Sequence, residues 1–208
     1  MRRCMIGTLL FGFALMFTLG AQITCADGSN LVTNGGFETG DFTGWTVAGP
    51  GCSAVVASLG ESLACLGGFV NEVPPHSGTF AAIFPLGGTG TISQTLATNL
   101  SDTYILAFWL SSVDNGFGVS PNGFDASWGG DSLLSLSDIS AGGYTEYIFS
   151  GLVPTGGSTT ISFSGFDSPA ALGLDDVSVA AVPEPSSLLS LSVGLLGLMA
   201  ARRQRQQA

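Results

Sequence analysis

The stretch YILAFWL, residues 104–110, has the period-two pattern of a strand with one face in a hydrophobic core. The residues on one face are large, and all are apolar or aromatic: Tyr104, Leu106, Phe108 and Leu110. Trp109 falls on the opposite face. One of these two faces is therefore expected to leave the core.

Similar short segments recur on both sides of this stretch, and residues typical of turns separate them. Further strands are expected at 31–33, 53–57, 79–84, 91–97, 124–128, 132–136, 146–150, 160–164 and 174–179. Helical periodicity is absent from this part of the chain. The sequence therefore predicts an all-β fold, an antiparallel β-sandwich or jelly roll over residues 27–181. A signal helix is expected before it and a transmembrane helix after it.

The predicted sandwich carries no Lys or Arg, because all five basic residues lie near the two ends of the chain. All 15 Asp and Glu residues except Glu184 lie in it. A surface of this charge repels phosphate backbones, so nucleic-acid binding is not expected. It also suits acidic glycans poorly, unless divalent cations bridge the two.

Residues 1–26 have the three parts of a secretory signal peptide. Arg2 and Arg3 precede an apolar run over 5–19, and small residues follow it. The expected cleavage sites are after Ala26 or after Ala21. A lipoprotein signal centred on Cys25 is the alternative.

Residues 186–201 form a second apolar run that contains no charged side chain. As a helix this run would reach about 24 Å, against a hydrocarbon core of about 30 Å. Because basic residues are retained on the cytoplasmic side, Arg202 and Arg203 predict that the tail stays inside and the sandwich outside.

The ending as a whole, residues 182–208, resembles the PEP-CTERM sorting signal. Its parts occur in order: Pro183, Glu184 and Pro185, then the apolar helix, then Arg202 and Arg203. The resemblance implies that a membrane-embedded exosortase processes the chain. It also implies export across the inner membrane of a Gram-negative bacterium to the envelope or extracellular matrix. An ordinary membrane anchor is the alternative.

Cys52 and Cys65 are the two cysteines well inside the predicted sandwich. An even pair in an oxidising compartment is expected to form a disulfide. Closing this short loop would contribute about 3 kcal/mol in the chain-entropy model.

Four segments resemble carbohydrate-binding modules with a galactose-binding-like jelly roll. They are residues 30–45 (NLVTNGGFETGDFTGW), 76–84 (HSGTFAAIF), 92–98 (ISQTLAT) leading to 104–110 (YILAFWL), and 174–179 (LDDVSV). In such modules, acidic residues of the first and last strands commonly hold a structural calcium ion. The matching positions are Glu38, Asp175 and Asp176. Oxygen donors of this kind suit calcium.

Strand alternation places Asp175 and Asp176 on opposite faces, with Asp175 inward as the favoured ligand. On opposite faces they cannot form a catalytic pair across one sugar. The alternative is that these carboxylates cap turns or face water.

Sugar-binding modules stack exposed aromatic rings on pyranose rings, and Trp109 and Trp128 are the candidates. Trp45 follows a turn and is expected to be buried; alternatively all three tryptophans lie in the core. His76 is expected to serve the turn around Pro75.

The sequence favours a non-enzymatic, exported envelope or matrix protein associated with exopolysaccharide, with exosortase as its processing partner. A carbohydrate-binding module and, less favoured, a glycan-active hydrolase are the alternatives, because sandwiches of this type host many functions.

Overall fold

A computed structural model describes residues 29–64, 69–70, 72–84, 88–113, 121–167 and 171–183. All of them fall in one compact unit, Ala26–Pro185. The predicted signal peptide, Cys65 and the chain after Pro183 lie outside the described residues. Within the described ranges, no helix has the length and apolar character needed to cross a membrane.

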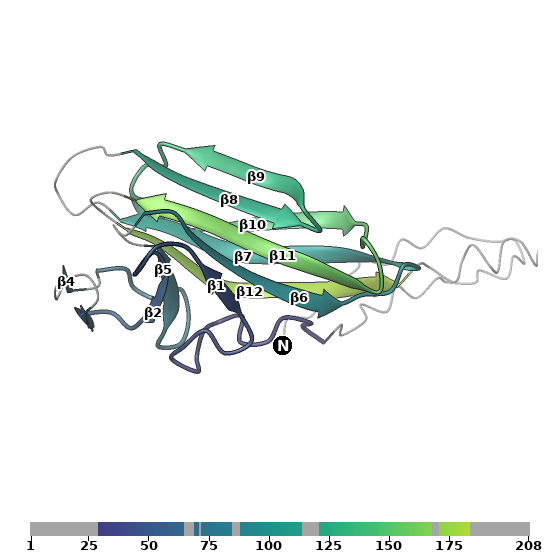
Figure 1. The fold of residues 1–208 in the computed structure, drawn as a ribbon, viewed down its shortest axis with the longest axis horizontal. Coiled ribbons are helices and arrows are strands. Elements are labelled where there is room, and N and C mark those ends of the chain that lie inside the picture. The colour runs from purple at the N-terminus through teal and green to yellow at the C-terminus, as the bar shows by residue number, and fades with distance from the viewer. Residues whose placement is uncertain are drawn as a thin grey trace, which may run out of the picture. The chain divides into compact units, whose positions relative to one another are not determined.

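The described strands form two five-stranded sheets and one small hairpin, and all their pairings are antiparallel (Figure 1). The first sheet contains, in spatial order, β1 (Thr46–Ala48), β6 (Gly90–Ala97), β11 (Ser158–Asp167), β8 (Asn122–Trp128) and β9 (Asp131–Ser137). The second sheet contains β10 (Gly142–Leu152), β7 (Asp102–Val113), β12 (Ala171–Pro183), β5 (Ala81–Phe84) and β2 (Val55–Ala57). The hairpin joins β3 (Ser62–Leu63) to β4 (Phe69–Val70). The predicted antiparallel two-sheet sandwich is confirmed.

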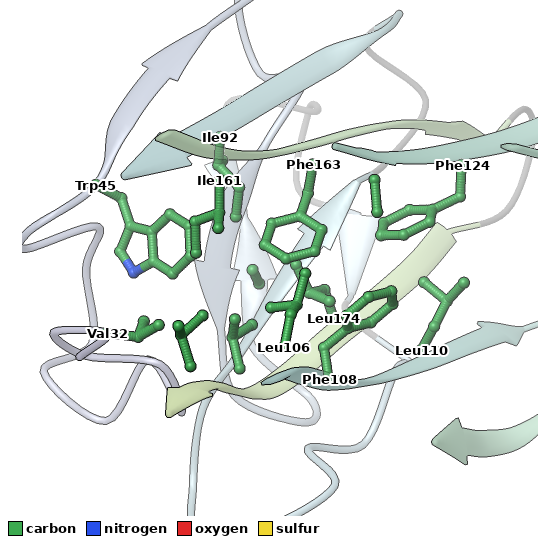
Figure 2. Packing of buried hydrophobic residues seen from close by; sticks show 14 of the residues in the cluster. Val32, Trp45, Ile92, Leu106, Phe108, Leu110, Phe124, Ile161, Phe163 and Leu174 are labelled. Atoms are coloured by element: carbon green, nitrogen blue, oxygen red, sulfur yellow. The ribbon is translucent and has the colours of Figure 1, made fainter. Parts of the chain in front are cut away.

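The hydrophobic core lies between the two sheets, and aromatic rings from both sheets meet in it (Figure 2). On β7, the four residues predicted to share one face are all buried. Phe108 meets Phe163 of β11 edge-on, with 5.1 Å between the ring centroids. Trp109 is only partly buried, so the face opposite Phe108 is the one that leaves the core.

A second apolar cluster covers the outer side of the second sheet at β5 and β2. Its buried members are Ala57, Leu63, Val73, Ala81 and Ile83. Leu63 belongs to the small hairpin, which therefore packs against this end of the sheet. Trp109 is not part of this cluster.

Residues 30–35 close the sandwich by attaching to β12, although they are not themselves a strand. The Leu31 N–H donates to the carbonyl of Val179 (2.8 Å), and the Val177 N–H donates to the carbonyl of Gly35 (2.9 Å). The strand predicted at 31–33 is therefore wrong in conformation, because turns replace it. The short strands β1, β3 and β4 were not expected.

Candidate functional site

A β-bulge in β12 reorients the two adjacent aspartates of the predicted metal site. The register of β12 against β7 shifts between Asp175 and Ser178, and Asp176 has a positive φ of 49°. Such a bulge breaks the strict alternation of a strand. The prediction that the two carboxylates point to opposite faces is wrong, because both contact the loop at His76 and Ser77.

Asp175 is fully buried and accepts hydrogen bonds from the main chain. Its Oδ2 accepts from the N–H groups of His76 (2.8 Å) and Ser77 (3.2 Å). Its Oδ1 accepts from the N–H of Asp176 (2.7 Å). Main-chain donors thus satisfy this carboxyl group where no Lys or Arg is available.

Asp176 is half-exposed and holds the side chains of the same loop. Its Oδ2 lies 2.6 Å from Nδ1 of His76, and its Oδ1 accepts from the Ser77 hydroxyl at 2.8 Å. The exposed side-chain fractions are 28% for His76 and 32% for Asp176. His76 therefore joins the loop to β12, in agreement with its expected structural role.

Glu38 completes a group of three carboxyl side chains around Gly36. Its Oε1 accepts from the N–H groups of Thr79 (2.9 Å) and Phe80 (3.0 Å). A Cβ atom on Gly36 would lie 3.4 Å from Oδ1 of Asp176, 3.8 Å from Oδ1 of Asp175 and 3.8 Å from Cγ of Glu38. The structure therefore brings the three predicted calcium ligands to one place.

The three carboxyl groups have the donor atoms that calcium prefers, but they are not arranged as a complete metal site. Carboxylate oxygens are the donors that calcium prefers. However, in the described part of the chain no three His, Cys, Asp or Glu side chains are arranged to hold a metal ion. Main-chain N–H groups of the 76–80 loop already occupy oxygens of Asp175 and Glu38.

Aromatic rings cover the outer face of the second sheet next to these carboxylates. Trp109 of β7 lies between Glu146 of β10 and Asp175 of β12 in the sheet register. The His76 ring stacks on the Trp109 indole, with centroids 3.9 Å apart and planes inclined by 15°. Tyr144 meets the His76 ring edge-on at 5.3 Å. We call Trp109, His76 and Tyr144 the aromatic cluster.

Two hydroxyl groups lie under the aromatic cluster. The hydroxyls of Tyr144 and Ser111 are buried, and neither makes a hydrogen bond of good geometry. Both would touch a Cβ atom on Gly173, so they approach the sheet at the same point. Burial raises the pKa of the Tyr144 phenol well above its ordinary value. Tyr144 therefore stays protonated and can donate a hydrogen bond.

Tyr144 was not identified from the sequence, although a signal for it exists. Tyr144, Glu146 and Ile148 share one parity in β10, and Tyr147 and Phe149 share the other. Tyr147 and Phe149 stack against Phe108 in the core. Continuing that alternation backwards places Tyr144 on the outer face.

Trp128 does not belong to the aromatic cluster, and its prediction as a sugar platform is wrong. Its side chain is buried with 3% exposure, and its Nε1–H donates to the carbonyl of Val153 at 2.7 Å. A ring enclosed in this way cannot stack on a sugar. Trp45 is buried, as expected, and its Nε1–H donates to the carbonyl of Asn34.

Cys52 is buried, but Cys65 lies outside the described residues, so the disulfide between them stays a prediction. Glu184, Pro185, Arg202 and Arg203 of the sorting signal also lie outside them. Pro183 is the last residue of β12.

The stability of the sandwich is expected to depend on pH through Asp175. Burial raises the pKa of this carboxyl to about 6, because removal from water disfavours its charged form. The folded state therefore binds the proton more tightly than the unfolded state does. The free energy of unfolding is therefore highest below about pH 4. It should fall by up to about 3 kcal/mol as the pH rises through about 6.

Urea unfolding in the presence of EDTA between pH 4 and pH 7 measures this dependence. The variant Asp175→Asn should lack this step in the free energy of unfolding, while other carboxyl groups keep their own pH dependence. If the free energy of unfolding depends on pH equally in the variant and the unmodified chain, the assignment to Asp175 is wrong.

Solved structures similar to this chain identify the type of fold. TmCBM61, solved in complex with beta-1,4-galactotriose, is 20% identical, with a TM-score of 0.52 over 72% of this chain and 97% of that chain. The K3 cleaved adhesin domain of Lys-gingipain from Porphyromonas gingivalis W83 is 16% identical, with a TM-score of 0.50 over 72% and 98%. The sandwich therefore has the jelly-roll fold of carbohydrate-binding modules.

The end of the chain matches a known sequence motif. Residues 181–205 match the PEP-CTERM protein-sorting motif, so the predicted sorting signal is confirmed. No curated protein is similar enough to this chain to count as a relative. The enzymatically active domain of tailspike protein 4 from bacteriophage CBA120 is also similar (15% identity, 74% of this chain and 21% of that chain). Its TM-score is 0.48.

Proposed function

We propose that this chain is an exported, non-enzymatic protein of the envelope or extracellular matrix whose sandwich binds a neutral polysaccharide. Exosortase would process its precursor at the PEP-CTERM motif. The observation that carries the binding proposal is the aromatic cluster, because half-exposed rings beside hydrogen-bonding groups are what a sugar ring requires. The fold of TmCBM61, which was solved with a galactotriose, is in keeping with this proposal.

The charge of the site favours a neutral glycan. Glu146 and Asp175 flank Trp109 in the sheet register, and Asp176 bonds to the His76 ring that stacks on it. The sequence between residues 26 and 182 has no Lys or Arg to pair with a uronate. Acidic sugars would therefore be repelled. We expect binding to neutral polysaccharide to change little with salt, since no ion pair is needed.

Replacing Trp109 by Ala tests the binding proposal. Retention of the full chain in affinity gels containing neutral polysaccharide should weaken about tenfold or more, because central aromatic anchors commonly contribute over 1.4 kcal/mol. Gels with β-1,4-galactan and with the exopolysaccharide of the producing cell would be run in parallel. Trp109→Phe should retain part of the affinity.

Ile148→Ala is the matched control, because Ile148 is exposed on β10 and does not belong to the aromatic cluster. Melting curves verify that each variant is folded. Unchanged retention of folded Trp109→Ala would contradict the binding site, and cleavage of either polysaccharide would contradict the non-enzymatic role.

We also propose that calcium binds the three carboxyl groups around Gly36 when the 76–80 loop rearranges. Support comes from their oxygen donors, their closeness and the lack of any Lys or Arg in the sandwich. Millimolar calcium should raise Tm relative to EDTA, since a ligand at about 100 times its Kd adds about 2.7 kcal/mol. Glu38→Gln should reduce the shift, and an unchanged Tm in the unmodified chain would dismiss the ion.

A further inference from the structure

The sorting motif begins inside the folded sandwich. The match starts at residue 181, whereas β12 continues to Pro183. In the sheet register, Ala181 faces Tyr104, Val182 faces Thr103, and Pro183 faces Asp102 of β7. The first proline of the Pro-Glu-Pro tripeptide is therefore a residue of the second sheet.

This end of β12 is held less firmly than the rest of the strand. The pairing with β5 covers only Leu172–Leu174, and the main-chain bonds from residues 31 and 35 reach only Val179 and Val177. Among the described residues, β7 is the one strand that pairs with 181–183. Val179 is fully buried, whereas Val182 is 39% exposed. Ala181 still packs against the edge of the core, and the Thr103 hydroxyl donates to the carbonyl of Val182 at 3.5 Å, so separation from β7 must break these contacts as well as the sheet pairing.

Only a short stretch of chain lies between the strand and the apolar run. Only Glu184 and Pro185 stand between Pro183 and the apolar run that starts at Ser186. Two extended residues span about 7 Å at most, which leaves little room for an enzyme beside a folded domain. A peptide bound by an enzyme is commonly extended, with its main chain bonded to the enzyme. Releasing 181–183 adds about 10 Å of free chain.

We propose that residues 181–183 form a processing gate, which must separate from β7 before exosortase can bind the motif. The proposal rests on the proposed sorting by exosortase and adds its regulation. The apparent affinity of the enzyme for the precursor is then reduced by the fraction of molecules in which the gate is open. Processing becomes dependent on the local stability of the strand end.

A disulfide across the gate tests the proposal in the full chain. Thr103→Cys with Val182→Cys would join directly opposed residues, whose Cα atoms lie about 4.5 or 5.5 Å apart in antiparallel sheets, within the range of a disulfide. The matched control joins Ile105→Cys to Ala180→Cys, one pair that also lies opposed on β7 and β12 but outside the motif. The single variants Thr103→Cys and Val182→Cys control for the side-chain changes.

Conversion of precursor to the shorter form would be followed by pulse-labelling in cells that carry exosortase, with the disulfides verified by mass spectrometry. We expect at least tenfold slower conversion with the bridge at 103–182. The control bridge at 105–180 and the single variants should behave like the unmodified chain.

Different outcomes separate the gate from the sorting proposal. If the chain bridged at 103–182 is converted at the unmodified rate, the gate is wrong and sorting stands. Equal slowing by the bridge at 105–180 would also overturn a gate confined to 181–183. If the unmodified chain is never shortened in the presence of exosortase, both proposals fail together.

Discussion

The variant Asp175→Ala should lose about 3 kcal/mol of the free energy of unfolding, the largest effect expected of any polar side chain at the site. The carboxyl group accepts from three main-chain N–H groups, those of His76, Ser77 and Asp176. Alanine leaves these donors without an acceptor in a buried place, at about 1–3 kcal/mol for each one that water cannot reach. Relief of the buried charge offsets part of this loss, so the sum is well below the maximum.

Thermal melting at pH 7 in EDTA measures the effect, and Tm should fall by roughly 6–12 °C. Asp175→Asn keeps one carbonyl acceptor and should lie between the unmodified chain and the alanine variant. Asp176→Ala is the matched control, because Asp176 is half-exposed and its loss should change Tm by only a few degrees. A larger effect at Asp176 than at Asp175 would contradict the described hydrogen bonds.

The variant Gly35→Ala should be destabilised by about 3 kcal/mol through a steric overlap. A methyl group on Gly35 would overlap the main-chain carbonyl of Val177 and also approach Val32 at 3.3 Å. The backbone of β12 cannot retreat easily, since it is paired with β7 on its other side. The attachment of residues 30–35 to β12 would therefore open.

The controls are Gly143→Ala and Gly157→Ala, where an added Cβ atom meets nothing within 4 Å. Urea unfolding should change by no more than about 0.5 kcal/mol in both controls. If Gly35→Ala is as stable as the two controls, the close packing of residues 30–35 on β12 is wrong.

The regular part of the fold could be predicted because period-two patterns record which side of a strand is buried. Phe108 and Trp109 are neighbours, and the side of Phe108 is the one inside the core. Trp128 could have been placed by the same argument. Phe124, Ala126 and Trp128 share one face of β8, with Asp125 and Ser127 on the other, so the pattern already indicated a buried ring.

The local geometry of the site could not be predicted, because it depends on a bulge that the sequence does not mark. Alternation alone separates Asp175 from Asp176, whereas the positive φ of Asp176 turns both toward His76. The stacking of His76 on Trp109 joins residues 33 positions apart, and it requires the loop to cross the sheet at that point. The resemblance to carbohydrate-binding modules predicted that the three carboxyl groups lie together. It did not predict the main-chain N–H groups that donate to them.

Mass spectrometry of the protein isolated from its native envelope would show whether the chain is exported and sorted. We expect a chain that begins after residue 21 or 26, has lost Arg202 and Arg203, and carries Cys52 and Cys65 joined as a disulfide. An intact chain of 208 residues with reduced cysteines would contradict this expectation.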